Sequence, residues 1–164
     1  MPVLGIIGWQ NSGKTTLVER LVQHFGETGL RVSTIKHAHH DVDVDQPGKD
    51  SWRHRQAGAV EVVLATARRT MSIHELRGAP EPSLDALVAR LRPVDLVLVE
   101  GFKSHDHPKL EVSRAATRQP LRAWDDPSVL AVASDYLPEG LHRPHFPLDD
   151  VAAIARFVRA TVGR

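Results

Sequence analysis

The chain has 164 residues, 41% hydrophobic and 25% charged, a composition typical of one soluble folded domain rather than of a disordered chain. A formal net charge of +1 excludes the one-sided basic surface of a nucleic-acid-binding protein, and no stretch approaches the roughly 20 apolar residues of a membrane span. The absence of cysteine excludes disulfides and thiolate metal sites and favours a reducing, cytoplasmic location.

The beginning of the chain predicts a strand, a helix and a second strand. Val3–Ile7 is a short apolar run, typical of a strand buried on both faces of a parallel sheet rather than of a signal peptide. A helix follows, which Gly26 or Gly29 is expected to end, and Leu30–Lys36 predicts the next strand. The apolar stripe of this helix consists of Leu17, Val18, Leu21, Val22 and Phe25.

The middle of the chain predicts a short helix and a hairpin. After a polar loop, Asp50 or Ser51 is expected to cap a helix that runs through Gln56. Val60–Ala65 and Thr70–Leu76 then predict two strands, paired as a hairpin at one side of the sheet.

The second half alternates helices with strands. Ser83 is expected to cap a helix that Pro93 ends, and Val94–Val99 is a second buried-strand pattern. The remaining predicted elements are strands at Leu110–Ser113 and Val129–Ala133 and a last helix capped by Asp149 or Asp150. This alternation predicts an α/β fold with a mainly parallel sheet and helices on both faces.

Residues 8–15 match the phosphate-binding pattern G-x-x-x-x-G-K-[ST] in full. The two glycines let backbone N–H groups curl around a phosphate, Lys14 reaches the β- and γ-phosphates, and the Thr15 hydroxyl ligates Mg²⁺. A buried strand before the loop and an amphipathic helix after it complete the expected context. Residues 1–164 are therefore predicted to form a single P-loop nucleotide-binding domain, a three-layer sandwich. The predicted nucleotide-binding residues are Gly8, Asn11, Ser12, Gly13, Lys14, Thr15 and Thr16.

A magnesium-binding acid is expected at the end of a second buried strand, which Asp95 and Glu100 bracket. Ligands of an open parallel sheet lie beyond the carboxyl ends of its strands. Asp95 opens its strand and lies roughly 16 Å from that edge at about 3.3 Å per residue. Glu100 is therefore predicted to bind Mg²⁺ with Thr15 and, with Lys14, to act in any catalysis.

A histidine-rich loop follows the second predicted strand, on the same ligand side. The favoured interpretation is that Lys36 and His37 contact phosphate or an anionic substrate. A plain polar loop and a transition-metal site remain the alternatives. The imidazoles and carboxylates concerned are His37, His39, His40, Asp41 and Asp43.

Two further features lie on this side. His105, Asp106 and His107 follow Lys103 and read as ordinary turn chemistry. Trp9 has two interpretations, stacking on a base or pterin ring and a half-buried surface anchor.

The identity of the base depends on Asp135. The guanine-binding pattern N-K-x-D is missing from the sequence, but Ala133-Ser134-Asp135 stands at the end of a late strand. A carboxylate there accepts two hydrogen bonds from the N1–H and N2–H₂ edge of guanine, whereas adenine offers no such pair. A guanine-reading residue and a simple turn residue remain the two alternatives for Asp135.

Several segments together resemble one family, the MobB adapter proteins of molybdopterin-guanine dinucleotide biosynthesis. The resemblance covers nearly the whole chain, in order, and the loop after the second strand and the E-G-F-K sequence make it specific. The segments concerned are residues 8–16, Thr34–His40, Pro47–His54, Leu98–Lys103, Leu110–Arg114 and Ala133–Asp135.

The resemblance implies a GTP-binding protein with weak Mg²⁺-dependent hydrolysis and a homodimeric state. Such a protein assists the molybdenum-cofactor guanylyltransferase, which joins GMP to molybdopterin. It implies that Lys36, His37 and the stretch from Lys49 to Arg53 face phosphates, a pterin or a dimer partner, with molybdopterin or its guanine dinucleotide as a further ligand. No membrane or nucleic-acid partner is expected.

Two other functions compete with this assignment. In a small-molecule P-loop kinase, Lys36, Arg53 and Arg55 form a phosphate clamp for the acceptor. In a metallochaperone-type GTPase, the histidine-rich loop binds nickel. Phosphorylation of an acceptor would indicate the first, and stoichiometric nickel or zinc binding the second.

Overall fold

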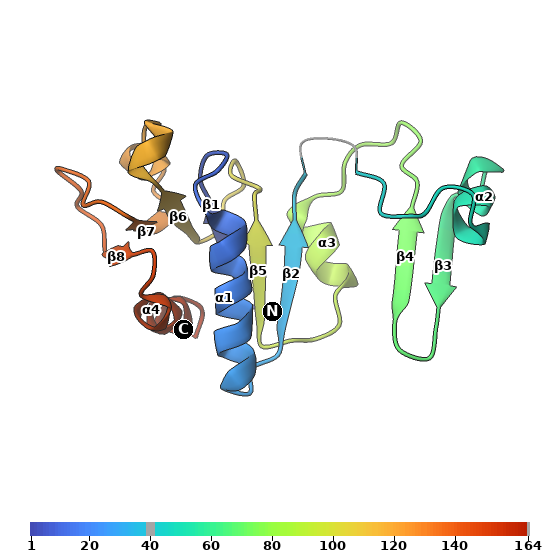
Figure 1. Ribbon diagram of the computed structural model, residues 1–164, viewed down its shortest axis with the longest axis horizontal. Coiled ribbons are helices and arrows are strands. Elements are labelled where there is room, and N and C mark those ends of the chain that lie inside the picture. The colour runs from blue at the N-terminus through green and yellow to red at the C-terminus, as the bar shows by residue number, and fades with distance from the viewer. Residues whose placement is uncertain (39–41, 164) are drawn as a thin grey trace. The chain divides into compact units, whose positions relative to one another are not determined.

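The computed structural model describes residues 1–38 and 42–163, and these form two compact units. Unit 1 consists of Met1–His37 and Leu84–Arg164, and unit 2 of Ala38–Ser83. The elements of unit 1 are β1 (Val3–Ile7), α1 (Lys14–Glu27), β2 (Val32–Lys36), α3 (Leu84–Arg90), β5 (Leu96–Glu100), β6 (Lys109–Ser113), two 3₁₀ turns (Ala115–Thr117 and Arg122–Trp124), β7 (Val129–Ser134), β8 (His145–Pro147) and α4 (Val151–Val162) (Figure 1).

The sheet of unit 1 has six strands in the order β2-β5-β1-β6-β7-β8, all of them parallel. β1 lies between β5 and β6, so the loop that leaves β1 emerges at the middle of the sheet's carboxyl edge. This confirms the predicted mainly parallel α/β fold. The sequence pattern missed β8, because three residues ending at Pro147 show no recognisable period.

Alternate residues of the central strands face opposite sides of the sheet. Leu96 and Leu98 of β5 belong to the core that α1 and α4 cover, whereas Val97 and Val99 pack with α3 on the other side (Figure 1). The continuous apolar run of this strand is therefore required by burial on both faces. Helices lie on both faces of the sheet, as predicted.

The ends of the helices differ in part from the predictions. α1 continues through the exposed Gly26 and ends at Glu27. Of the two predicted glycines, Gly29 lies at this end, with φ +81° and its N–H donating to the Gly26 carbonyl at 3.0 Å. Asp150 caps α4, with its carboxylate accepting from the N–H of Ala153 at 2.9 Å. The predicted caps of α2 (Asp50–Gln56) are wrong: Lys49 precedes the helix.

Unit 2 contains α2, β3 (Glu61–Ala65) and β4 (Thr70–His74). The two strands form the predicted antiparallel hairpin, but they make a sheet of their own and not one side of the main sheet. Arg55 organises this unit: its guanidinium lies 2.6 Å from Glu75, 2.8 Å from Asp43 and 3.1 Å from Asp45. The hydroxyl of Ser51 also donates to Asp45, at 2.8 Å, instead of capping α2.

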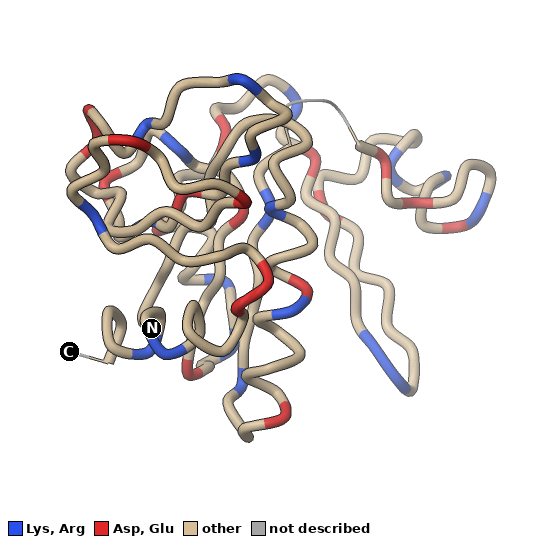
Figure 2. The backbone as a smooth tube through the Cα atoms, turned by 60° about the vertical axis from the view of Figure 1, so that its left-hand side comes forward, with Lys and Arg blue, Asp and Glu red and all other residues tan. Residues whose placement is uncertain are grey.

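Positive and negative residues are interspersed along the chain (Figure 2), as a formal net charge of +1 requires. Within the described residues, no helix is both long and apolar enough to cross a membrane.

Candidate nucleotide site

The phosphate loop connects β1 to α1, and its shape depends on glycine. Gly8 has φ +144°, and a Cβ there would lie 2.2 Å from the carbonyl oxygen of Val112. Gly13 has φ +99°, and its Cβ would lie 3.2 Å from Nε of Arg114. Both positions combine a backbone angle that favours glycine with close packing against β6 or the residue after it, so side chains are excluded there.

Ser12 gives this loop an unusual buried oxygen. Its side chain is fully buried, and within the described residues Oγ has no hydrogen-bond partner. Buried polar groups in folded proteins are normally paired. The loop around it turns tightly, with Asn11 at φ +63° and the N–H of Ser12 donating to the carbonyl of Trp9 at 3.2 Å. An orphaned hydroxyl in a loop of turned N–H groups fits a phosphate oxygen as the missing partner.

Lys14 provides the positive charge of the loop. Its ammonium donates to the carbonyl oxygen of Trp9 at 2.7 Å, so the side chain already reaches back across the loop. Burial lowers the pKa of Lys14, and the positive charges of Lys36 and Lys103 lower it further, whereas Glu100 acts in the opposite direction. The charges of Lys36 and Lys103 thus act on Lys14 across the loop, and cations gathered in this way attract a polyanion.

Glu100 lies at the carboxyl end of β5, as the direction of the chain predicted. Its Oε1 accepts a hydrogen bond from the Thr15 hydroxyl at 2.9 Å and lies 3.3 Å from the ammonium of Lys36. Asp95, at the other end of β5, is bound instead by the guanidinium of Arg31 at 3.1 Å. A hydroxyl and a carboxylate side by side at the phosphate loop are the oxygen donors that Mg²⁺ prefers, so the residues present fit this ion.

His37 packs against the turn that follows Glu100. Its N–H donates to the Glu100 carbonyl at 2.9 Å, and its ring stacks on Phe102 with a centroid distance of 4.6 Å. Gly101 has φ +102°, and a Cβ on it would lie 2.9 Å from Cβ of His37. The structure thus places Lys36 and His37 at the same edge as Glu100, with the Lys36 ammonium at the carboxylate and the His37 ring against Phe102.

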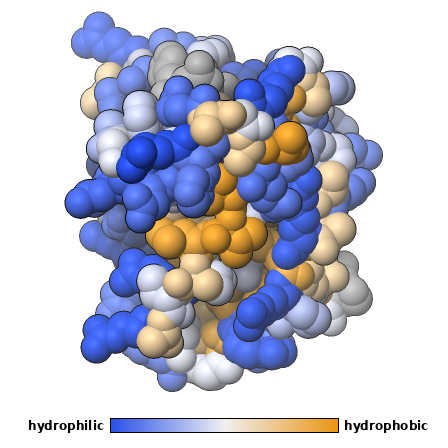
Figure 3. Space-filling model, turned by 90° about the vertical axis from the view of Figure 1, so that its right-hand side faces the viewer, coloured by the Kyte–Doolittle hydropathy of each residue, from blue (hydrophilic) through white to orange (hydrophobic). Residues whose placement is uncertain are grey.

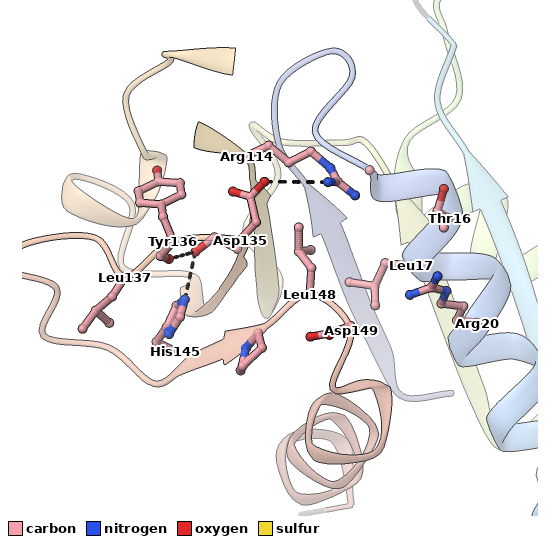
Figure 4. Close-up of a pocket in the computed structure, with 13 residues that line it drawn as sticks. Thr16, Leu17, Arg20, Arg114, Asp135, Tyr136, Leu137, His145, Leu148 and Asp149 are labelled. Carbon is pink, nitrogen blue, oxygen red and sulfur yellow. Dashed lines mark hydrogen bonds and ion pairs between the residues drawn. The ribbon is translucent and has the colours of Figure 1, made fainter. Parts of the chain in front are cut away.

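A cavity of about 600 Å³ opens beside Gly13 and contains Asp135 (Figure 4). Arg114 and Asp135 point toward one another across it, with Nη1 3.7 Å from Oδ2 (Figure 4). Oδ1 of Asp135 accepts the N–H of Ala115 at 2.8 Å. The cavity is lined by Thr16, Leu17 and Arg20 of α1, by Ser134, Asp135, Tyr136 and Leu137 after β7, and by His145, Pro147, Leu148 and Asp149.

Several lining residues were not anticipated from the sequence. Arg114 directly follows β6, and its position at a strand's carboxyl end is a signal that could have identified it. Tyr136 follows β7 and carried the same signal, whereas Leu148 carried none, because it follows β8, the strand that the sequence pattern missed.

Other predicted site residues lie elsewhere or are not described. Lys49 and Arg53 belong to unit 2, where Lys49 lines a cavity with Arg69 and Arg53 lines a separate hollow beside Trp52. His39, His40 and Asp41 lie outside the described residues. In the part of the chain that the structure describes, no three His, Cys, Asp or Glu side chains are grouped to hold a metal ion.

Comparison with known proteins identifies the family of the chain. Residues 3–135 match the MobB family, described as molybdopterin guanine dinucleotide synthesis protein B. The molybdopterin-guanine dinucleotide biosynthesis adapter protein of Haemophilus influenzae is 42% identical over 96% of this chain and 88% of its own length. That of Escherichia coli is 38% identical over 96% and 91%. The crystal structure of Bacillus subtilis MobB superposes with a TM-score of 0.79 at 26% identity, covering 99% of this chain and 98% of the other. The chain belongs to the MobB family.

Proposed function

We propose that this chain is a GTP-binding adapter that assists the attachment of GMP to molybdopterin in the biosynthesis of molybdopterin guanine dinucleotide. Its family membership supports the pathway, which is also the one named for its relatives. The binding of a nucleotide is supported by one observation: Gly13 of the phosphate loop and the Asp135 carboxylate line the same cavity. On this proposal residues 1–164 act as a single nucleotide-binding domain, in the cytoplasm, consistent with a chain without cysteine.

In this proposal the triphosphate lies in the loop from Gly8 to Thr16. The backbone N–H groups and the Ser12 hydroxyl donate to phosphate oxygens. The ammonium of Lys14 leaves the Trp9 carbonyl oxygen and binds the β- and γ-phosphates instead. Thr15 and Glu100 hold Mg²⁺ between them, and the ion supplies charge neutralisation at the phosphates. Lys36, already at Glu100, adds a further positive charge.

The base is guanine, bound through its N1–H and N2–H₂ groups by Asp135. A carboxylate has about four lone-pair sites, so Asp135 retains acceptor capacity besides its bond to the Ala115 N–H. Any hydrolysis is slow and needs Mg²⁺, because the Glu100 carboxylate is already engaged by Thr15 and Lys36 and is a poor base for water.

The partners in this proposal are the molybdenum-cofactor guanylyltransferase and a second copy of the chain. The hairpin β3–β4 supports the homodimer, because its first strand exposes apolar side chains. Val63 and Leu64, which lie on opposite faces of β3, are 64% and 45% exposed, and Val60, directly before the strand, is 58% exposed. Apolar side chains form a continuous stretch among hydrophilic ones in the space-filling view (Figure 3). Pairing with the same hairpin of a second copy would cover such side chains.

Molybdopterin or its guanine dinucleotide is the further ligand in this proposal. Lys36 and His37 lie at the phosphate edge, whereas Lys49 and Arg53 offer positive charge in unit 2 for an anionic group of a partner. These four residues are proposed as anion contacts rather than as a metal site.

Calorimetric titration with GTP and with ATP, each with Mg²⁺, tests the proposal. We expect GTP to bind and ATP to bind at least about tenfold more weakly, since adenine cannot donate the paired hydrogen bonds. Asp135→Asn is expected to abolish this preference, whereas Asp149→Asn, in the same cavity, leaves it intact. A preference for ATP would contradict the proposal and favour a small-molecule kinase.

A further inference from the structure

A second cavity, of about 630 Å³, borders the phosphate loop and shares no lining residue with the Asp135 cavity. Trp9 of the phosphate loop lines it, whereas Gly13 of the same loop lines the Asp135 cavity. Its other walls come from the loop after β5 and from residues 120–128. A molecule that crosses the phosphate loop can therefore place one end in each cavity.

Trp9 presents a fixed aromatic surface to this second cavity. Its Nε1–H donates to the carbonyl oxygen of Pro120 at 2.9 Å, which sets the orientation of the ring. The ring is nonetheless 38% exposed, and the ammonium of Lys103 lies 5.9 Å from its centroid. A large aromatic side chain that is anchored at its edge and left accessible is suited to stacking on a planar ring.

The charges around Trp9 are of two kinds. Lys109 is buried and satisfied, with its ammonium bonded to Ser128 and 3.6 Å from Asp126, so it stabilises the wall. Lys103 and Arg122 are different: among the described residues, neither has a carboxylate within ion-pair distance. Asp125, on the same rim, likewise has no cation within that distance in the described part of the chain. Arg122 does feel the charge of the buried Glu111, which also accepts its backbone N–H at 3.0 Å, but its guanidinium makes no ion pair with any described residue. Two cations and one carboxylate without such a partner suit a ligand with an anionic arm and a polar ring edge.

We propose that this cavity binds the pterin end of a pterin–guanine dinucleotide whose guanine occupies the Asp135 cavity and whose diphosphate lies on the phosphate loop. The pterin ring stacks on Trp9, Lys103 and Arg122 contact the phosphate side of that half, and Asp125 accepts N–H groups of the ring edge. This inference rests on the proposed function, which supplies a dinucleotide with these two ends. It assigns the protein a role in holding both halves of the product at once.

The test uses 6-hydroxymethylpterin monophosphate as probe and follows the quenching of its fluorescence by the wild-type protein. We expect Trp9→Ala to weaken binding about tenfold and Trp9→Phe to restore most of it, because phenylalanine keeps a stacking face. Trp124→Phe is the matched control, since Trp124 does not line this cavity. Arg122→Ala should weaken binding of the monophosphate about fivefold and leave binding of uncharged 6-hydroxymethylpterin unchanged.

A second titration separates this inference from the proposed function. With GMP present at saturation the probe should still bind, because GMP leaves the second phosphate position of the proposed diphosphate to the probe, and Asp135→Asn should not affect it. Displacement of the probe by GMP, or equal binding by Trp9→Ala and wild type, would overturn the inference. If GTP binds with the expected specificity and the probe does not bind, only the inference fails. Probe binding without GTP binding would instead count against the proposed function alone.

Discussion

Arg114 reaches from the end of β6 to Asp135, with Nη1 3.7 Å from Oδ2, while its Nε lies 3.2 Å from the position a Cβ would take on Gly13. One guanidinium therefore touches the phosphate loop and the proposed base-reading carboxylate together. The arrangement couples the two halves of the nucleotide site before any ligand is bound.

Replacing Arg114 by alanine is expected to weaken GTP binding about tenfold, because one charge-assisted contact beside Gly13 and the cation that orients Asp135 are lost together. Isothermal titration with Mg²⁺–GTP measures this. Arg156→Ala, an exposed change on α4, is the matched control. If both variants bind GTP equally well, Arg114 has no part in the site.

Glu100→Gln is expected to remove most of the gain in GTP affinity that Mg²⁺ provides, about tenfold, because an amide is a poor ligand for a hard cation. Titrations with Mg²⁺ and with excess chelator give this ratio of affinities. Asp95→Asn is the control at the opposite end of β5, where Asp95 is held by Arg31. A full Mg²⁺ effect in Glu100→Gln would exclude Glu100 from the metal site.

Stability should fall in mild acid through His107, whose two ring nitrogens are buried without a hydrogen-bond partner among the described residues. Burial lowers the pKa of His107 below the ordinary 6.5, and the positive charges of Lys109 and His105 lower it further, whereas Asp106 acts oppositely. Below that ordinary value the unfolded chain binds a proton that the folded chain does not, so the free energy of unfolding decreases as the pH falls.

Urea denaturation at a series of pH values between about 7 and 5 measures this dependence. His107→Gln should flatten the profile, since glutamine does not titrate in this range. The exposed His142→Gln should leave the profile as in the wild type. Parallel profiles for His107→Gln and wild type would show that another group causes the acid sensitivity.

The phosphate loop should tolerate alanine less well than an ordinary turn with the same backbone requirement. Gly29→Ala meets no atom within 4 Å and only has to adopt φ +81°, which costs about 1–2 kcal/mol. Gly8→Ala would in addition place its Cβ 2.2 Å from the Val112 carbonyl oxygen, so the loss in free energy of unfolding should be larger. Urea denaturation of both variants compares the two; equal losses would show that the loop relaxes away from β6.

Much of the site was predictable because its signals are local. The phosphate loop is a contiguous segment whose glycines are required by backbone angles, and β1 and β5 are apolar because both faces are covered. Chain direction alone selected Glu100 over Asp95, and the Thr15–Glu100 hydrogen bond at 2.9 Å agrees with that choice. The separate hairpin sheet was not predictable, since a pattern of alternating residues does not say which strands will be neighbours.

By itself, the sequence determined the α/β class, the phosphate loop and the resemblance to its family, because short-range backbone sterics and hydrophobic periodicity act within a few residues. Only the tertiary structure decided that Arg114 meets Asp135, that Trp9 and Gly13 line different cavities, and that β8 forms one edge of the sheet. Those contacts join residues far apart in the chain. They form when the parallel strands align their carboxyl ends and the connecting loops pack beside them.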